Sequence, residues 1–314
     1  MQNTARQQEE MKKQTIGIEV ECYGIERKKA ASVAATFFGT NRFKDTARTN
    51  GYKAWSAWDQ QGREWKFMTD SSIDDAICRQ CEMVSPILHY EDIPTLQELL
   101  RQLRHAGAKS DPRHTCGVHI HIGAQGHTAQ SLRNLVNLMA SHESLLAESI
   151  GVAPSRMNYC KTVDPEFLRQ INEKKPESMA DFADIWYGSQ GSSYRRGEHY
   201  NPSRYHMLNL HATFTKGTIE FRLFQFDNPS EERKGGIHAG QVKAYIQLCL
   251  ALSQMAKDSH RISPKPQQTE NKKFAMRTWL MRLGFIGEEF ATAREVFAKR
   301  LSGNAAFRNG RPAA

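Results

Sequence analysis

The stretch Cys116-Gly-Val-His-Ile-His-Ile122 decides the fold, because two histidines stand two residues apart in a run that is otherwise mostly apolar and β-branched. Successive side chains of a β-strand point to opposite faces of its sheet. His119 and His121 are therefore predicted to share one face of a strand, while the valine and the two isoleucines of the stretch lie on the other.

Two further runs, at residues 16–22 and 218–224, alternate between polar and apolar positions in the same way. A short apolar run at residues 81–84, ended by Pro86, carries one more acidic residue. The polar positions of these three runs are Glu19, Glu21, Glu82, Glu220 and Arg222. Several strands that each carry one polar face predict a functional site on a sheet.

Composition favours a globular protein, with 39% hydrophobic and 25% charged residues. No apolar run has the length that a membrane span needs, and the first residues lack the hydrophobic segment of a secretory signal. We therefore expect a cytoplasmic protein with no membrane partner. The 6 cysteines fit reduced thiols better than a disulfide framework, and the pair Cys78-x-x-Cys81 alone is weak evidence for a zinc site.

The formal net charge of +9 is concentrated in residues 261–314, where eleven Lys and Arg stand against four Asp and Glu. A basic segment of this kind can hold an anionic partner, although a solvated helical face is the simpler interpretation. The rest of the chain is nearly neutral, so a nucleic-acid partner is not expected.

The order of elements predicts an α+β fold in which helices pack on the apolar side of a sheet and leave its polar side open. Hairpins are predicted around residues 59–62 and between the runs 205–214 and 218–224. The main helices are predicted near residues 28–38, 92–106, 129–150 and 236–257. Four segments follow from this pattern: a flexible end at 1–14, a catalytic domain at 15–260, an insertion within it at 152–204 with a possible lid, and a basic helical appendage at 261–314.

Carboxylates that converge on one sheet face repel each other unless cations neutralise them. Hard oxygen ligands suit Mg²⁺ or Mn²⁺, and Mn²⁺ tolerates an added imidazole. Arg222 has the planar fork that suits a phosphate. Together these residue types point to nucleotide phosphate chemistry.

Two other functions remain open from the residues alone. The first is a zinc-dependent hydrolase that uses His119 and His121 with Cys78 and Cys81 or with carboxylates. The second is a non-catalytic binding protein that docks an anionic partner through its basic segment. Each polar pair taken singly is commonly a solvated strand face, and only their coincidence favours a site.

The order of the motifs resembles that of the amidoligase family, which belongs with carboxylate–amine ligases such as glutamine synthetase and glutamate–cysteine ligase. The resemblance covers roughly residues 15–255. Its motifs are Gly17-Ile-Glu-Val-Glu21, Trp65 with Asp70-Ser-Ser72, Glu82-Met-Val-Ser-Pro86, the stretch from Cys116 to Gly123, Leu208-Asn-Leu210 and Thr218-Ile-Glu-Phe-Arg-Leu-Phe224.

That resemblance implies a glutamine-synthetase-type catalytic domain, with a curved antiparallel sheet, helices on its convex face and the active site in its concave face. It implies ATP-dependent amide formation: a carboxylate on an amino acid, a peptide or a protein side chain attacks the γ-phosphate, and an amine then displaces phosphate from the acyl phosphate. ATP and Mg²⁺ or Mn²⁺ are the implied cofactors.

The resemblance also implies a role for each matching residue. The implied metal ligands are Glu19, Glu21, Glu82, His119 and Glu220. His121 and Arg222 would hold the nucleotide phosphates and the phosphoryl group in transfer, and Asp70 would act with Glu220 and Arg222 in catalysis. Asn209 matches a family position that faces the site, while Arg156 and Arg204 are basic candidates for a phosphate or a substrate carboxylate.

Overall fold

A single antiparallel sheet organises the molecule. The structure, a computed structural model, describes residues 2–228, 236–266 and 270–307. Within these residues eight strands form the sheet in the order β2-β3-β4-β5-β1-β6-β8-β7. The strands are β1 (Ile16–Cys22), β2 (Phe43–Asp45), β3 (Trp55–Trp58), β4 (Glu64–Met68), β5 (Cys81–Val84), β6 (Val118–Gly123), β7 (Leu208–Asn209) and β8 (Thr218–Phe224). The predicted α+β class is confirmed.

The central strand β1 lies between β5 and β6, and β8 follows β6, so the four strands with polar motifs are neighbours. The predicted alternation of polar and apolar residues decides which side chains lie on each face of these strands. Ile18 and Val20 are 1% exposed, and Ile120 of β6 is fully buried beside Ile18. The opposite face carries the glutamates and histidines, because the side chains alternate along each strand.

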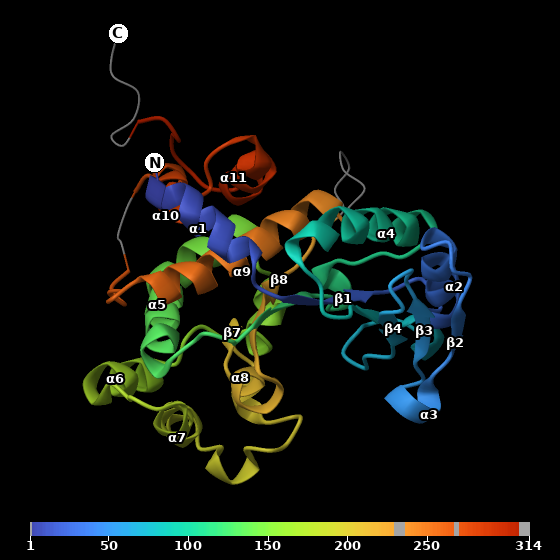
Figure 1. Cartoon of the computed structure of the whole chain (residues 1–314), viewed down its shortest axis with the longest axis horizontal. Helices are drawn as coiled ribbons and strands as arrows, with labels where there is room; N and C mark the ends of the chain where they lie inside the picture. Colours follow the sequence, from blue (N-terminus) through green and yellow to red (C-terminus); the bar gives the residue numbers. More distant parts are fainter. Residues whose placement is uncertain (1, 229–235, 267–269, 308–314) are drawn as a thin grey trace.

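Helices cover the apolar face of the sheet in Figure 1. They are α2 (Arg27–Phe37), α4 (Ile93–His105), α5 (Ala129–Ile150) and α9 (Ala239–Asp258). α9 packs against β6 and against the other long helices, and its side chains from Ala244 to Leu252 are buried. No helix in the described ranges is both long enough and apolar enough to cross a lipid bilayer.

The predicted hairpin between residues 205–214 and β8 is confirmed only for residues 208–209, while the hairpin of β3 and β4 is confirmed. Only the two residues of β7 pair with β8, and the chain then forms helix α8 (His211–Lys216). The side-chain oxygen of Asn209 accepts a hydrogen bond from the backbone N–H of His211 (2.9 Å), which favours a turn into the helix over further strand. Gly217 ends α8 with a φ of 69°.

The polar face is covered, which corrects the expectation that it stays open. Residues 152–204 form helices α6 (Pro165–Lys174) and α7 (Met179–Ser189) and several short turns, and α7 and α8 lie below the sheet in Figure 1. Burial of the aromatic side chains of Phe167, Phe182 and Trp186 holds these helices together. The site is therefore a partly covered cavity that still opens to solvent.

Both ends of the described chain join the main core. Where a flexible end is predicted at residues 1–14, helix α1 (Gln2–Lys12) lies along α9, and its Met11 is fully buried. Helices α10 (Lys272–Arg282) and α11 (Ala291–Ala298) lie on the same side of the molecule. Residues 308–314 of the predicted appendage lie outside the described residues.

Several cations of the basic segment are paired within the molecule. Lys299 and Arg300 both contact Asp227 at 2.6 Å, and Lys272 contacts Glu148 of α5 at 2.5 Å. These ion pairs neutralise part of the positive charge that, under the binding-protein hypothesis, would hold an anionic partner.

Glu143 of α5 should make stability depend on pH. It accepts a hydrogen bond from the backbone N–H of Val163 (2.9 Å), and burial raises its pKa from 4.5 to about 7. Because the folded protein holds this proton more tightly than the unfolded chain, its stabilising effect is complete below pH 4.5 and is lost as pH rises through 7.

Glu143→Gln copies the protonated shape and should remove that part of the pH dependence. We expect the variant to be more stable than the wild type by up to ~3 kcal/mol at about pH 8 in urea unfolding. Glu177→Gln, at an exposed position, is the control and should leave the pH profile unchanged. Parallel profiles for wild type and Glu143→Gln would contradict the assignment.

Candidate functional site

A cavity of about 440 Å³ lies between the polar face of the sheet and the segment that covers it. The predicted site residues that line it are Glu19, Glu21, Asp70, Glu82, His119, Arg156, Arg204 and Arg222. Glu220 and Asn209 line a second cavity of about 190 Å³, which shares Arg204 with the first. His121 is buried beside Glu19, so the structure brings the whole predicted set into one region.

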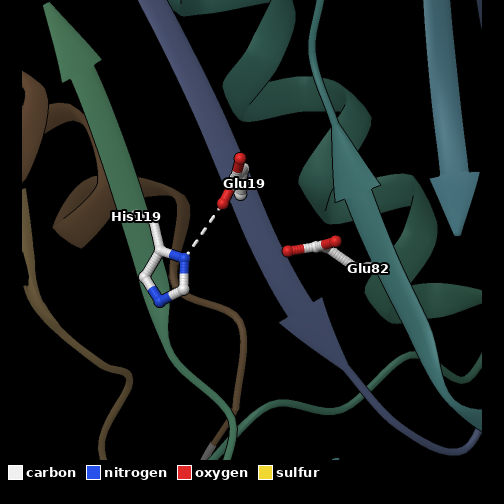
Figure 2. Close-up of side chains that lie close together, drawn as sticks. All are labelled: Glu19, Glu82 and His119. Carbon is white, nitrogen blue, oxygen red and sulfur yellow. Dashed lines mark hydrogen bonds and ion pairs between the residues drawn. The ribbon is translucent and has the colours of Figure 1, made fainter. Parts of the chain in front are cut away.

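Glu19 is at the centre of the polar face. The strand register places it directly opposite His119, and the Nδ1 of His119 lies 3.0 Å from its Oε2. The Nε2 of His121 lies 3.4 Å from its other oxygen. Figure 2 shows Glu19 on β1 between His119 on β6 and Glu82 on β5.

Three groups of side chains in the described part of the chain could each hold a metal ion, because their ligand atoms lie within 4.8 Å of one another. We call them donor groups. They are Glu19 with Glu82 and His119, Glu19 with His121 and Glu220, and Glu21 with Asp70 and Glu82. Since Glu19 and Glu82 each belong to two groups, the three form one continuous cluster.

The charges of this cluster are not balanced within the protein. Burial raises the pKa of Glu82 well above its usual range, and the carboxylates of Glu19, Asp70 and Glu21 raise it further. Burial acts on Glu19 in the same direction, but the neighbouring imidazoles of His121 and His119 outweigh it and hold its pKa well below the usual range. Crowding that forces a carboxyl toward its neutral form is relieved by a bound cation.

Glu220 is fixed as an anion at the edge of the cluster. Burial favours its neutral form, but the guanidinium of Arg222 and the imidazoles of His121 and His119 together outweigh burial and lower its pKa to about 2. The Nη1 of Arg222 lies 2.5 Å from one carboxylate oxygen, and the side-chain amide of Asn209 donates to the other at 2.6 Å. Asn209 thus orients Glu220 and faces the second cavity.

A β-bulge lies in the pairing of β6 with β8, next to Arg222. Val118 opposes Phe224, whereas Ile120 opposes Phe221, so β8 carries one extra residue between these pairs. Bulges of this kind redirect side chains beside functional sites. Glu220 and Arg222 share the polar face by regular alternation, and the bulge brings Phe224 opposite Val118 on the apolar face.

Arg156 supports the site from one side. Its guanidinium donates to the backbone oxygens of Arg222 (3.0 Å) and Thr115 (3.4 Å) and lies 4.0 Å from Glu21. A Cβ at Gly117 would lie 2.2 Å from its Nη1, so a larger residue there would displace the Arg156 guanidinium. Arg156 is therefore largely committed to holding strands together, which leaves it less free for a ligand than the sequence suggested.

The cluster fits a hard divalent cation. Oxygen donors outnumber imidazoles in each of the three groups of the described residues, which suits Mg²⁺ or Mn²⁺. Cys81 does not join the imidazoles, because it is fully buried in the core and pairs in register with Cys22. The zinc site that the hydrolase hypothesis draws from Cys78 and Cys81 therefore lacks support.

Sequence reasoning missed several groups that line the cavity. Two are lysines, Lys66 of β4 and Lys216 of α8, and four are tyrosines, Tyr52, Tyr159, Tyr200 and Tyr205. Lys66 could have been found, since it stands two residues before Met68 and four before Asp70 and so shares their face. The tyrosines follow no period and come from segments that meet only in the fold.

The tyrosines connect the covering segment to the sheet. The hydroxyls of Tyr52 and Tyr200 lie 3.3 Å apart, and this contact, followed by burial, raises the pKa of Tyr200 to about 12. The guanidinium of Arg204 lies over the rings of Tyr200 and Tyr205, at 5.5 and 5.9 Å from their centres. The contact of Tyr52 with Tyr200 joins residues far apart in sequence, whereas the contacts of Arg204 are local to the covering segment.

Comparison with known proteins gives a family and distant similarity to solved structures. The family described as "Putative amidoligase enzyme" matches residues 12–253. No curated protein matches the sequence. A solved structure of a bifunctional glutathione synthetase from Pasteurella multocida is similar at 13% identity and a TM-score of 0.42, over 95% of this chain and 48% of that one. The chain thus spans about half the length of that protein.

Proposed function

The chain belongs to the amidoligase family, whose reaction joins a carboxylate to an amine, and we propose that it does so with ATP through an acyl phosphate formed in the cavity. The proposed substrates are a carboxylate on an amino acid, a peptide or a protein side chain, and an amine. The residues proposed to carry the reaction are those of the three donor groups together with Arg222.

One observation supports this proposal above the others: the convergence of Glu19, Glu21, Glu82, His119 and Glu220 in one cluster beside Arg222. A site for joining two anions needs positive charge where they meet, and a carboxylate cluster recruits that charge as a metal. Bound Mg²⁺ or Mn²⁺ would neutralise phosphate oxygens and bring them toward the substrate carboxylate.

Two buried nitrogens of the site make no hydrogen bond within the described ranges, the Nε of Arg222 and the Nε2 of His121. The Nε2 of His121 lies 3.4 Å from a carboxylate oxygen of Glu19. Buried donors of this kind are costly unless a ligand pairs with them. Arg222, held by Glu220, is proposed to bind the γ-phosphate oxygens, and His121, oriented by Thr218 at 3.0 Å, to bind a neighbouring phosphate.

The reaction would follow two steps. An oxygen of the substrate carboxylate attacks the γ-phosphorus, and the bond to ADP breaks with its electrons on the ADP oxygen. The amine nitrogen then attacks the carbonyl carbon, phosphate leaves, and the nitrogen loses a proton. Arg222 would stabilise charge on the phosphoryl group in the first step and on the leaving phosphate in the second.

The surrounding architecture has a proposed role as well. The acyl phosphate must be shielded from water, and residues 188–204 are proposed as the lid that does so, since Tyr200 and Arg204 line the cavity. An antiparallel sheet with helices on one face and the site on the other supports the proposed glutamine-synthetase-type domain over residues 15–260.

Calorimetry with a non-hydrolysable ATP analogue tests the function. The analogue should bind in the presence of Mn²⁺ and bind much more weakly without it. With ATP, ADP should appear only when both a carboxylate and an amine are supplied, and ¹⁸O from the carboxylate should appear in the released phosphate. Absence of nucleotide binding with Mn²⁺ would overturn the proposal.

The two histidines should give different defects. His119→Ala removes a donor that contacts Glu19 at 3.0 Å and Glu21 at 3.6 Å, so metal affinity and activity should fall together. His121→Ala should chiefly weaken nucleotide binding, by about tenfold. Titrations of Mn²⁺ and of the ATP analogue on both variants provide the comparison. His121 also belongs to a donor group, so its loss could weaken metal binding as well. Identical defects in the two variants would contradict the division of roles between the histidines.

A further inference from the structure

One end of the cavity, at strand β4, carries a cation that the proposed reaction does not use. Lys66 is partly buried and lines the cavity, and it makes no ion pair in the ranges that the structure describes. By contrast, Arg222 is paired with Glu220, and Arg156 is bonded to backbone oxygens. A cavity lysine that is not paired with a protein carboxylate is available to an anionic group of a ligand.

The sheet register fixes where this lysine lies relative to the donor groups. Lys66 opposes Val84, Val84 opposes Glu19, and Glu19 opposes His119, so the four residues form one row across four neighbouring strands. With strands about 4.8 Å apart, the backbone of Lys66 is about 10 Å from that of Glu19. Only Val84 stands between them in this row.

The same register separates Lys66 from the proposed phosphate site. β4 and β8 are the two ends of the series β4-β5-β1-β6-β8, which is four strand spacings or about 19 Å. Arg222 is on β8, so the metal cluster lies between the two cations. An anion at Lys66 would therefore be on the opposite side of the cluster from the nucleotide phosphates.

Hydroxyl groups accompany the lysine at this end. Thr69 also lines the cavity, and its Oγ1 is buried and has no hydrogen-bond partner within the described chain. The backbone N–H of Thr69 donates to the backbone oxygen of Tyr52 (3.0 Å), which brings the Tyr52 side chain to the cavity as well. A cation in a cavity that residues with hydroxyl groups also line is a suitable environment for a carboxylate.

We propose that Lys66 binds a second anionic group of the carboxylate substrate, which makes the substrate a dicarboxylate. This inference rests on the proposed function. One carboxylate would react at the donor groups, the other would pair with Lys66, and the apolar chain between them would pass over Val84. The row of residues requires the two carboxylates to be roughly 5–10 Å apart. Lys66 would thereby determine specificity without taking part in the chemistry.

Calorimetry with matched acids tests this. The protein is first loaded with Mn²⁺ and the ATP analogue, and then titrated with unbranched dicarboxylates from succinate to suberate, each beside its monoamide. We expect at least one dicarboxylate to bind about tenfold more tightly than its monoamide. In Lys66→Met, which keeps the length and loses the charge, this preference should fall to about twofold or less, whereas Lys66→Arg should keep it.

Lys44→Met is the matched control. Lys44 is exposed on the edge strand β2, over the ring of Trp58, and should leave the preference unchanged. Equal affinity for every acid and its monoamide, no binding of either, or an unchanged preference in Lys66→Met would overturn the proposal. If Lys66→Met instead loses affinity for the ATP analogue, the β4 end of the cavity binds the phosphates, and the proposal is also overturned. Failure of the analogue to bind in the loading step would count against the proposed function, so the two failures are distinguishable.

Discussion

Glu19→Gln is expected to lower kcat/KM on the order of 10³-fold and to weaken Mn²⁺ binding in the same variant. Glu19 belongs to two of the three donor groups and contacts both imidazoles, at 3.0 and 3.4 Å. Glutamine keeps the shape of the side chain but removes the negative charge that a cation needs. Both groups that share Glu19 would therefore weaken together.

Parallel titrations of Mn²⁺ and assays of ADP release measure this effect. Glu26→Gln, at an exposed position outside the cavity, is the control and should match the wild type in both. Thermal unfolding of the metal-free proteins shows whether the fold is kept. A folded Glu19→Gln variant with unchanged Mn²⁺ affinity would contradict the role given to this residue.

Arg222→Met is expected to lower the free energy of unfolding of the metal-free protein by ~3–5 kcal/mol, because it leaves Glu220 buried without its cation. The two side chains are 8% and 3% exposed and lie 2.5 Å apart. Since Arg222 is the main cause that holds the pKa of Glu220 down to about 2, its loss lets burial raise that pKa. The destabilisation should then diminish as pH falls and Glu220 becomes neutral.

Urea unfolding of a double-mutant cycle isolates the pair. Arg222→Met with Glu220→Gln should recover much of the lost stability, because no uncompensated charge is left. Arg113→Met removes an arginine whose side chain is 55% exposed and that pairs with Asp111, and it should cost about 1 kcal/mol or less. A double variant no more stable than Arg222→Met would contradict the account of this pair.

The faces of the strands were predictable from the sequence, because alternation is a local property. Glu19, Glu21, His119 and His121 stand at every second position of runs whose other residues are apolar, and burial of the apolar set fixes the orientation. The hairpin at residues 59–62 was predictable for the same reason. The order of the strands was not, since it depends on which apolar faces meet in the folded chain.

The sequence did not predict features that depend on contacts between residues far apart in the chain. Helix α8 replaces a predicted strand because Asn209 supports a turn, and helix α1 forms at a polar end because Met11 reaches the core beside α9. The closure of the cavity by Tyr52 and Tyr200 joins residues 148 positions apart, which no local pattern contains. The face on which Lys66 lies could be predicted from the alternation of side chains along its strand. Its proposed role could not, because that role depends on the row that Lys66 forms with Glu19.

The central claim is that the polar face of the sheet is a divalent-metal and nucleotide site. A crystal structure with Mn²⁺ and the non-hydrolysable ATP analogue, with anomalous scattering recorded for manganese, tests it most directly. Manganese should appear at about 2.2 Å from carboxylate oxygens of Glu19 and Glu82, with the γ-phosphate between it and Arg222. Manganese bound elsewhere, or a nucleotide bound away from this cluster, would contradict the claim.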